Sequence, residues 1–328
     1  MKRRAVLAAL PLGGCAAQPL GYMTDTAGHA ADAISQIGWG LAIVSIIVVV
    51  LIAALIALAI ARGRQRLCAE GDVVGRDYGG LSWIYWGVGL SFPVLVALAV
   101  WTFIVTRAVA EPPRPTALTI EVTAHRWWWE VRYRGERPVD DFVAANHLVV
   151  PVGVPVRLVL TSSDVIHDFW VPKIGPKMDM IPGKTNVTWI EADRAGLYRG
   201  QCAEYCGLEH ARMAFTVAAV PLVDFRRWRM AEQRPQDPGG GRGATIFASA
   251  CAACHAVRGT DAAGIYGPDL THFASRPTIA AGVLPNTVAG RVKWLADTQG
   301  VKPGAAMPQV PLDPADRVAL VQYLGTLR

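Results

Sequence analysis

Charged residues are absent from two long stretches of this 328-residue chain. Residues 38–61 and residues 81–106 contain no Asp, Glu, Lys or Arg, and aliphatic and aromatic side chains fill most of both stretches. A helix of about 20 such residues crosses a hydrocarbon core of about 30 Å, and buried helices of soluble proteins are rarely so long and so apolar. We therefore expect a two-helix transmembrane hairpin within residues 30–110, with helices at about 38–61 and 81–106.

Cysteine and histidine are both scarce, with six and seven residues in the chain. Four cysteines form two close pairs, whereas Cys15 and Cys68 stand alone, a pattern that favours binding sites over a disulfide framework. The two charge-free stretches contain no histidine, so they offer no cluster of histidine ligands within a membrane. The net charge of +6 accompanies 52% hydrophobic residues, which argues against a nucleic-acid partner.

The first fifteen residues are typical of an export signal. Residues 1–4 are "MKRR", and residues 5–12 form an apolar run that is too short to span a bilayer. The run ends at "LGGC", which resembles a bacterial lipobox, in which Cys15 would be lipidated and become the first mature residue. Cleavage of an ordinary signal peptide near Ala17 is the alternative. Residues 1–15 are therefore predicted to be a leader.

The segment between the two apolar stretches is basic. It contains Arg62, Arg64, Arg66 and Arg76, and basic loops stay on the cytoplasmic side of a membrane. We therefore expect a multi-pass protein of the bacterial cytoplasmic (inner) membrane. Everything after about Arg107 would lie on the periplasmic or outer face.

The chain changes character after the second apolar stretch. Residues 116–224 contain short alternating runs rich in β-branched and aromatic types, separated by turn residues, which predict a β-sandwich or barrel. The polar sequence "AEQRPQDPGGGRG" is rich in proline and glycine, so residues 225–242 are predicted to be a flexible linker. Residues 243–328 form a third predicted domain.

One loop of the predicted β domain gathers soft metal ligands. Cys202, Cys206, His210 and Met213 lie within twelve residues, and His167 lies upstream in another turn. A disulfide suits an exported domain but leaves the histidines and the methionine unexplained. Structural zinc suits Cys and His but has little use for a thioether. Thiolate, imidazole and thioether together favour copper.

A Cys-x-x-Cys-His motif lies near the start of the third domain. Cys251, Cys254 and His255 follow a helix-like segment in a part of the chain expected to be exported, where c-type haem is attached. The two cysteines would form thioethers with the haem vinyl groups, and the histidine would bind the iron. The last stretch, "DPADRVALVQYLGTLR", predicts an amphipathic helix.

The spacing Cys-x-x-x-Cys-x-x-x-His-x-x-Met closely resembles the CuA domain of subunit II of haem-copper oxidases. The resemblance extends to "VIHDFWVPKIGPKMDMIPGKTN", to "GLYRGQCAEYCGLEHARM" and to the two preceding membrane helices. It implies that residues 116–224 form an all-β cupredoxin domain, a Greek-key β-sandwich or barrel. It also implies a binuclear copper centre, CuA, in which two ions share the thiolates of Cys202 and Cys206.

The same resemblance implies how the remaining ligands divide between the two ions. His167 and Met213 would complete one copper, and His210 with the backbone carbonyl of Glu204 would complete the other. The side chain of Glu204 resembles the family's ligand to a magnesium ion at the interface with subunit I. Trp127, in "HRWWWEV", matches by position the tryptophan through which electrons enter.

The third domain is similar to the cytochrome c tail of caa3-type oxidase subunits, which implies an all-α class I cytochrome c fold. By this resemblance Cys251 and Cys254 hold haem c, and His255 is the proximal ligand with Pro268 near it. Met307 is followed by proline and resembles the sixth ligand, a neutral thioether that raises the haem potential.

Together these features imply the electron-transfer subunit of a membrane-bound terminal cytochrome c oxidase. The fused haem c would accept electrons and pass them to CuA, which would reduce a haem in subunit I. Oxygen reduction to water, coupled to proton translocation, would take place in that partner. Subunit III, membrane lipid, and a cytochrome c or quinol–cytochrome c reductase as electron donor are the other expected partners, with no nucleic acid.

One departure from the family concerns protons. Members often carry a membrane-facing glutamate early in the second helix, where this chain has Trp86, and the nearest carboxylate is Asp77. This puts proton uptake through this subunit in doubt. Two other functions stay open: the CuA subunit of a nitric oxide reductase, or a membrane-anchored copper or electron shuttle without an enzyme partner.

Overall fold

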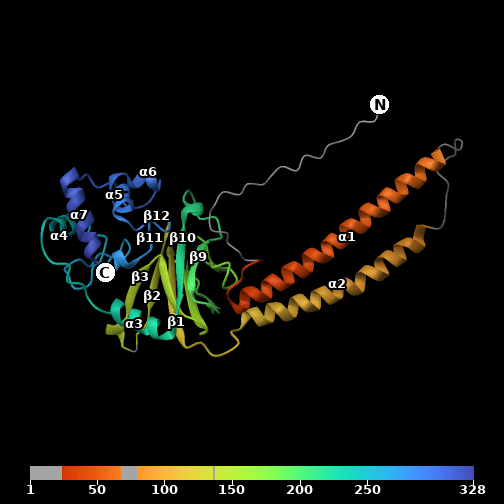
Figure 1. The fold of residues 1–328 in the computed structure, drawn as a ribbon, viewed down its shortest axis with the longest axis horizontal. Helices are drawn as coiled ribbons and strands as arrows, with labels where there is room; N and C mark the ends of the chain where they lie inside the picture. The colour runs from red at the N-terminus through yellow and green to blue at the C-terminus, as the bar shows by residue number, and fades with distance from the viewer. Residues whose placement is uncertain (1–23, 68–79, 136) are drawn as a thin grey trace.

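The computed structural model describes residues 24–67, 80–135 and 137–328 (Figure 1). The predicted leader, Cys15, Cys68 and Asp77 lie outside these residues. An apolar helical hairpin, a β-sandwich and a small helical domain follow one another along the chain (Figure 1). The predicted multi-domain architecture is therefore confirmed.

Two long helices form the hairpin and run side by side away from the β-sandwich (Figure 1). They are α1 (His29–Leu67) and α2 (Gly80–Ala110), and by length and composition both are candidate membrane spans. No residue of their most apolar windows is buried, which distinguishes them from core helices of a soluble protein. Both helices extend beyond the charge-free stretches, because the flanking turns are rich in good helix formers such as alanine.

The hairpin is attached to the β-sandwich at its base. Before α1, the Ala27 amide donates to the Lys173 carbonyl (2.7 Å), and the Ala27 carbonyl accepts from the Asp193 amide (2.9 Å). Near the end of α2, the Val109 carbonyl accepts from the Trp189 indole (2.9 Å). The extramembrane domain therefore holds the ends of both helices.

The β-sandwich consists of two five-stranded sheets. One has the order β3 (Phe142–Ala145), β2 (Trp128–Tyr133), β1 (Leu118–His125), β5 (Val156–Ser162) and β8 (Asn186–Ile190). The other has the order β4 (His147–Pro151), β10 (Ala214–Val220), β9 (Gly196–Cys202), β6 (His167–Trp170) and β7 (Met178–Met180). Neighbouring strands are antiparallel except for the parallel pairs β1–β5 and β4–β10.

Alternation along the strands builds the core between the sheets. In β2, Trp129, Val131 and Tyr133 are completely buried, and the residues between them are half-buried. This period of two is the pattern expected where one face of a sheet packs inward. A short 3-10 helix, η1 (Pro138–Asp140), leads into β3, and another, η2 (His210–Arg212), lies between β9 and β10.

An additional helix follows the β-sandwich, and here the structure differs from the predicted linker. Helix α3 (Leu222–Glu232) occupies the first part of residues 225–242. Phe225 is buried, and the Trp228 ring lies 5.1 Å from that of Tyr133 and 5.6 Å from that of Phe142. The other large apolar residues of the helix are exposed and three of its residues are arginines, so two aromatic side chains hold it against the domain.

The C-terminal domain is mainly helical. Its elements are α4 (Arg242–Ala250), η3 (Phe273–Ser275), the strand pair β11 (Thr278–Ile279) and β12 (Leu284–Pro285), α5 (Val288–Ala296), α6 (Thr298–Val301) and α7 (Pro314–Thr326). Phe247 of α4 packs in one core with Leu320 and Leu324 of α7. A Cβ on Gly243 would lie 2.3 Å from the Ala319 carbonyl, so the two helices approach closely because residue 243 has no side chain.

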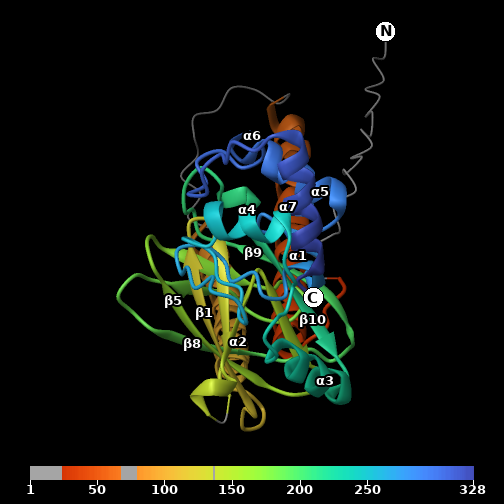
Figure 2. The ribbon, with the colours of Figure 1, turned by 90° about the vertical axis from the view of Figure 1, so that its left-hand side faces the viewer.

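Figure 2 shows the molecule from the side of this helical domain. The domain lies at the opposite side of the β-sandwich from the hairpin (Figure 1). The β-sandwich is therefore placed between the candidate membrane spans and the helical domain.

Candidate functional site

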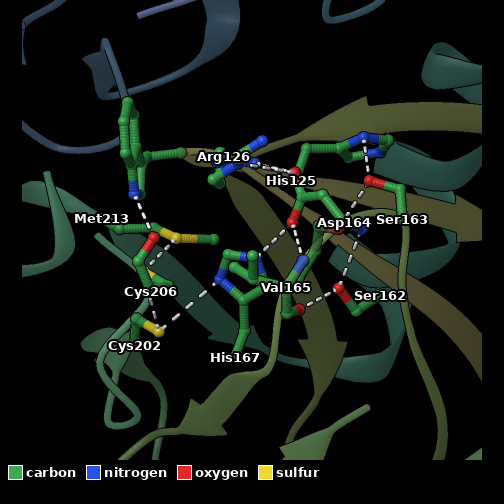
Figure 3. Close-up of polar contacts among 12 residues, drawn as sticks. His125, Arg126, Ser162, Ser163, Asp164, Val165, His167, Cys202, Cys206 and Met213 are labelled. Atoms are coloured by element: carbon green, nitrogen blue, oxygen red, sulfur yellow. Dashed lines mark hydrogen bonds and ion pairs between the residues drawn. The ribbon is translucent and has the colours of Figure 1, made fainter. Parts of the chain in front are cut away.

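The predicted copper ligands come together at one end of the sheet that contains β6 and β9, and Figure 3 shows four of them: His167, Cys202, Cys206 and Met213. Cys202 is the last residue of β9, and His167 is the first residue of β6, the neighbouring strand. Cys206, His210 and Met213 belong to the loop that leads from β9 to β10. Strands β9 and β10 pair antiparallel, and β6 pairs with β9 on its other side. The loop between β9 and β10 therefore turns back at the end of β6 and brings its side chains to His167.

Two thiols lie at the middle of this group. The Sγ atoms of Cys202 and Cys206 are 3.8 Å apart, and both cysteines are free. The other donors surround them: His167 Nδ1 is 3.8 Å and the Glu204 carbonyl 3.2 Å from Cys202 Sγ, while His210 Nδ1 is 3.6 Å and Met213 Sδ 3.8 Å from Cys206 Sγ. All six predicted donors therefore contact one or the other sulfur.

The donors are divided between the two sulfurs. Donor atoms of His167, Cys202 and Cys206 all lie within 4.8 Å of one another, a spacing that could hold a metal ion. His210 lies outside this compact group but approaches Cys206. The two imidazoles thus approach different sulfurs of the central pair.

The contact between the two thiols shifts their pKa values in opposite directions. The hydrogen bond from the Cys206 thiol lowers the pKa of Cys202, and the hydrogen bond with His167 lowers it further. The same contact raises the pKa of Cys206, because a second thiolate would form beside the first. Cations bound to both sulfurs would remove this conflict, since a bound metal deprotonates its thiol ligands.

Asp164 fixes the ring of His167 (Figure 3). The carboxylate lies 2.8 Å from Nε2 of the imidazole and also accepts hydrogen bonds from the amides of Arg126 and Val165, both at 2.7 Å. Nδ1 is left facing the sulfurs. A carboxylate on the far nitrogen of a metal-binding histidine orients the ring and increases its basicity.

The backbone and the side chain of Glu204 have different surroundings. Its carbonyl is at the thiol of Cys202, whereas its side chain is exposed. The neighbouring side chain of Tyr205 is also exposed, at 75% of its full area, and so is Leu208, at 68%. The outer side of this loop therefore presents one carboxylate and two large apolar groups to the surroundings.

Sequence reasoning missed two buried acids beside the site. Asp168 is nearly inaccessible, and burial followed by its contact with Asp179 raises its pKa to about 7. Glu209 is 1% exposed, with its carboxylate 3.4 Å from the Arg212 guanidinium and without a hydrogen bond in the described part of the chain. Their positions next to His167 and His210 were the only signals in the sequence.

Trp127 touches the metal loop directly. Its indole nitrogen donates to the Cys206 carbonyl at 3.0 Å, and the residue is only 9% exposed. Carbons of the ring lie 3.1 Å from where Gly207 would carry a Cβ and 3.5 Å from where Gly304 would. Gly304 belongs to the helical domain, so the predicted point of electron transfer lies between the two domains.

The Cys-x-x-Cys-His residues follow α4 in the helical domain. The Pro268 carbonyl lies 2.8 Å from Nδ1 of His255, which confirms the predicted proximity and leaves Nε2 for a metal. A Cβ on Gly267 would lie 2.5 Å from the imidazole, so residue 267 must lack a side chain. Burial raises the pKa of Cys251 to about 11, whereas Cys254 is exposed. The donor set and the fixed ring fit covalent haem attachment.

Met307 borders the same apolar cluster as Cys251. Gln299 holds its loop, donating from its side-chain amide to the carbonyls of Ala305 and Met307, both at 2.9 Å. His272 has a structural role: its Nδ1 is 3.0 Å from Gln236 Nε2 and its Nε2 is 3.2 Å from the Arg234 carbonyl.

A cupredoxin-like domain with clustered soft ligands, followed by a helical domain with a haem-attachment motif, defines a class: membrane-anchored electron-transfer subunits of haem-copper oxidases. Residues 136–220 match the family "Cytochrome C oxidase subunit II, periplasmic domain", and residues 241–328 match the family "Cytochrome c". The second match implies haem c, and the first implies copper.

Two similar proteins are both named cytochrome c oxidase subunit 2. Cytochrome c oxidase subunit 2 of Alkalihalophilus pseudofirmus is 38% identical over 256 residues, which are 75% of this chain and 72% of that protein. The subunit 2 of Bacillus sp. strain PS3 is 33% identical over 268 residues, 75% of this chain and 74% of that one. A crystal structure of the periplasmic domain of subunit II from Bradyrhizobium japonicum covers 37% of this chain and 96% of its own, at 32% identity and a TM-score of 0.34.

The chain belongs to the cytochrome c oxidase subunit 2 family. It carries a cytochrome c domain in addition, and it has an electron-transfer role in a haem-copper oxidase in which subunit I is its partner. The two apolar helices are its membrane anchor.

Proposed function

We propose that the chain relays electrons from a fused haem c through a binuclear copper centre to a haem in subunit I. Oxygen would be reduced to water in that partner, with proton translocation. The donor would be a cytochrome c or a quinol–cytochrome c reductase, and subunit III would complete the assembly in the bacterial cytoplasmic membrane. The β-sandwich and the cytochrome domain would lie on its outer face.

One observation carries this proposal: four further donors surround two adjacent thiols, which makes six donors that suit copper. Two thiolates, two imidazoles, a thioether and a carbonyl exceed the four ligands of a structural zinc site. The two adjacent thiols, each approached by one imidazole, would hold two copper ions. A copper pair that shares one unpaired electron accepts and releases it with little structural change.

The residues of this chain keep that centre rigid and dry. Cys202, Cys206 and Met213 are buried among the apolar core, and His167 is completely inaccessible. Asp164 holds the His167 ring by hydrogen bonding. Fixed ligands cannot follow a change in charge far, so little reorganisation accompanies electron transfer.

The contact of Trp127 with the Cys206 carbonyl supports this residue as the point where electrons enter from the haem side. In the cytochrome domain, Cys251, Cys254 and His255 would hold haem c with Met307 as sixth ligand. On the side facing subunit I, the exposed carboxylate of Glu204 would bind magnesium together with groups of that subunit.

Electron paramagnetic resonance of the purified oxidase complex tests the copper centre. One electron shared equally by two coppers gives a characteristic hyperfine pattern, which we expect from the native chain. Met213→Leu should change that pattern because it removes the thioether, whereas Met230→Leu should not, because Met230 is 57% exposed on α3.

A mononuclear copper signal, or zinc without copper, would overturn the binuclear site. Isolation of the chain without an oxygen-consuming partner, and with copper that exchanges readily, would instead favour a shuttle. A partner that reduces nitric oxide and not oxygen would favour the nitric oxide reductase.

A further inference from the structure

Lys302 is a buried lysine at the boundary between the two extramembrane domains. It follows α6 in the helical domain and is 3% exposed. In the described part of the chain it makes no ion pair within 4.0 Å. Its ammonium instead donates to three backbone carbonyls: Trp127 at 2.7 Å, Ala280 at 3.0 Å and Arg212 at 3.1 Å.

The three carbonyls belong to three separate segments. Trp127 lies between β1 and β2, and Arg212 lies in the metal loop next to Met213. Ala280 lies between β11 and β12 of the helical domain. One side chain of the helical domain therefore binds two segments of the β-sandwich next to the metal site, and also a second segment of its own domain.

Other contacts at the same boundary support a single docked arrangement. The Arg212 guanidinium donates to the Val301 carbonyl at 2.9 Å, and the Ala214 amide donates to the Ala281 carbonyl at 3.0 Å. A Cβ on Gly282 would lie 2.9 Å from that of Ala214. Specific hydrogen bonds and close backbone approach of this kind require one relative position of the domains.

A buried ammonium is costly unless its donors are satisfied. Burial lowers the pKa of Lys302 to about 8, so the side chain remains largely charged near neutral pH. A lysine has three N–H donors, and here each has a carbonyl acceptor. Removing the ammonium would leave these three carbonyls without that buried donor, and a buried acceptor that loses its partner destabilises the arrangement.

We propose that Lys302 is a positioning residue that latches the cytochrome domain over Trp127, so that electrons pass from haem to copper within one docked state. The inference rests on the proposed function, because it takes the two cofactors and Trp127 as the route. Trp127 is 9% exposed in this state, with Gly304 of the cytochrome domain packed against its ring.

The test uses the whole oxidase complex with Lys302→Met, which keeps an apolar stem and removes the donors. Lys293→Met is the matched control, because Lys293 is exposed on α5 of the same domain. One electron is delivered to haem c by a light-activated reductant. Its transfer is followed by haem reoxidation and by the near-infrared absorbance of the copper centre.

We expect Lys302→Met to slow the transfer about tenfold, because a smaller fraction of molecules is docked at any moment. The rate should also become sensitive to glycerol viscosity, since domain movement would then precede transfer. Lys302→Gln retains N–H donors and should give an intermediate rate. Hydrogen exchange of the Ala214 amide should be faster in Lys302→Met than in Lys293→Met. This amide donates to the Ala281 carbonyl of the cytochrome domain, so it is exposed when the domains separate.

If electron transfer from haem to copper were equally fast and independent of viscosity in both methionine variants, with both cofactor spectra intact, the proposed role of Lys302 would be wrong. A missing copper signal in the native complex would overturn the proposed function instead. Amide exchange at Ala214 would still decide the latch in that case: unchanged exchange in Lys302→Met would refute it, and faster exchange would support it.

Discussion

Single hydrogen bonds fix the ring of His167, one of the predicted copper ligands. Asp164 accepts from two backbone amides and contacts the imidazole, so its carboxylate is itself held in place. Contacts with His167 and both amides lower the pKa of Asp164, against the opposing effect of burial. The Asp164 carboxylate therefore keeps its negative charge and can orient the His167 imidazole.

Asp164→Asn should weaken copper binding about 10- to 100-fold, because the neutral amide no longer supports the imidazole. Competition with a copper chelator, followed by the absorbance of the site in the purified chain, measures the change. Asp261→Asn is the control, since Asp261 is exposed in the cytochrome domain. Equal affinity in the two variants would show that Asp164 has no such role.

Residue types and spacing predicted the five side-chain donors, and the family resemblance added the Glu204 carbonyl, but neither predicted the groups that support them. Cysteine, histidine and methionine carry distinctive chemistry, so their spacing alone indicates a metal site. Glu209 and Lys302 are ordinary charged residues in sequence. Their importance arises from burial and from contacts such as that between Lys302 and Trp127, which are 175 positions apart. No local pattern encodes a contact of that kind.

At the level of secondary structure, α3 is an element that sequence reasoning missed, because it lies where a linker was predicted. Its polar and arginine-rich composition, with Arg226, Arg227 and Arg229, resembles a solvated linker. Strands were predictable because their alternation is set by the two faces of a sheet. A short helix held by two aromatic residues offers no comparable repeat.

Trp228→Ala should loosen α3 from the β-sandwich, at a cost of about 2 kcal/mol for a half-buried aromatic side chain. Trypsin should then cleave after Arg226 and Arg227 at least about tenfold faster, because cleavage requires local unfolding of the helix. Val223→Ala on the same helix is the control, since Val223 is 62% exposed. Cleavage at the same rate in both variants would contradict an anchoring role for the tryptophan.

At the scale of the whole molecule, the domains were predictable one by one but their docking was not. Composition separates the hairpin, the β-sandwich and the cytochrome domain, because each has a different pattern of apolar residues: long charge-free runs, alternation along short strands, and amphipathic helices. The boundary between the last two is built from backbone carbonyls, glycines and single side chains. These features specify a position only after both domains have folded.

His147, at this domain boundary, is expected to make the stability of the protein depend on pH. It lies on β4, with Nδ1 2.7 Å from the Thr216 hydroxyl, and its neighbour across the boundary is Arg276 of the cytochrome domain. Burial, with a smaller contribution from the positive charge of Arg276, lowers the pKa of His147 to about 4. The imidazole is therefore neutral in the folded protein at neutral pH.

A lowered histidine pKa means that the unfolded chain binds the proton more readily than the folded one. The stabilisation is complete above the ordinary pKa of about 6.5 and is lost as pH falls toward 4. At pH 4.5 the expected loss of folding free energy is about 2–3 kcal/mol.

His147→Gln cannot take up this proton, so its melting temperature should fall several degrees less than that of the native chain between pH 7 and 4.5. Thermal unfolding of the detergent-solubilised full chain measures the difference. His29→Gln, at an exposed position, should behave like the native chain, and parallel pH dependence in all three proteins would contradict the prediction.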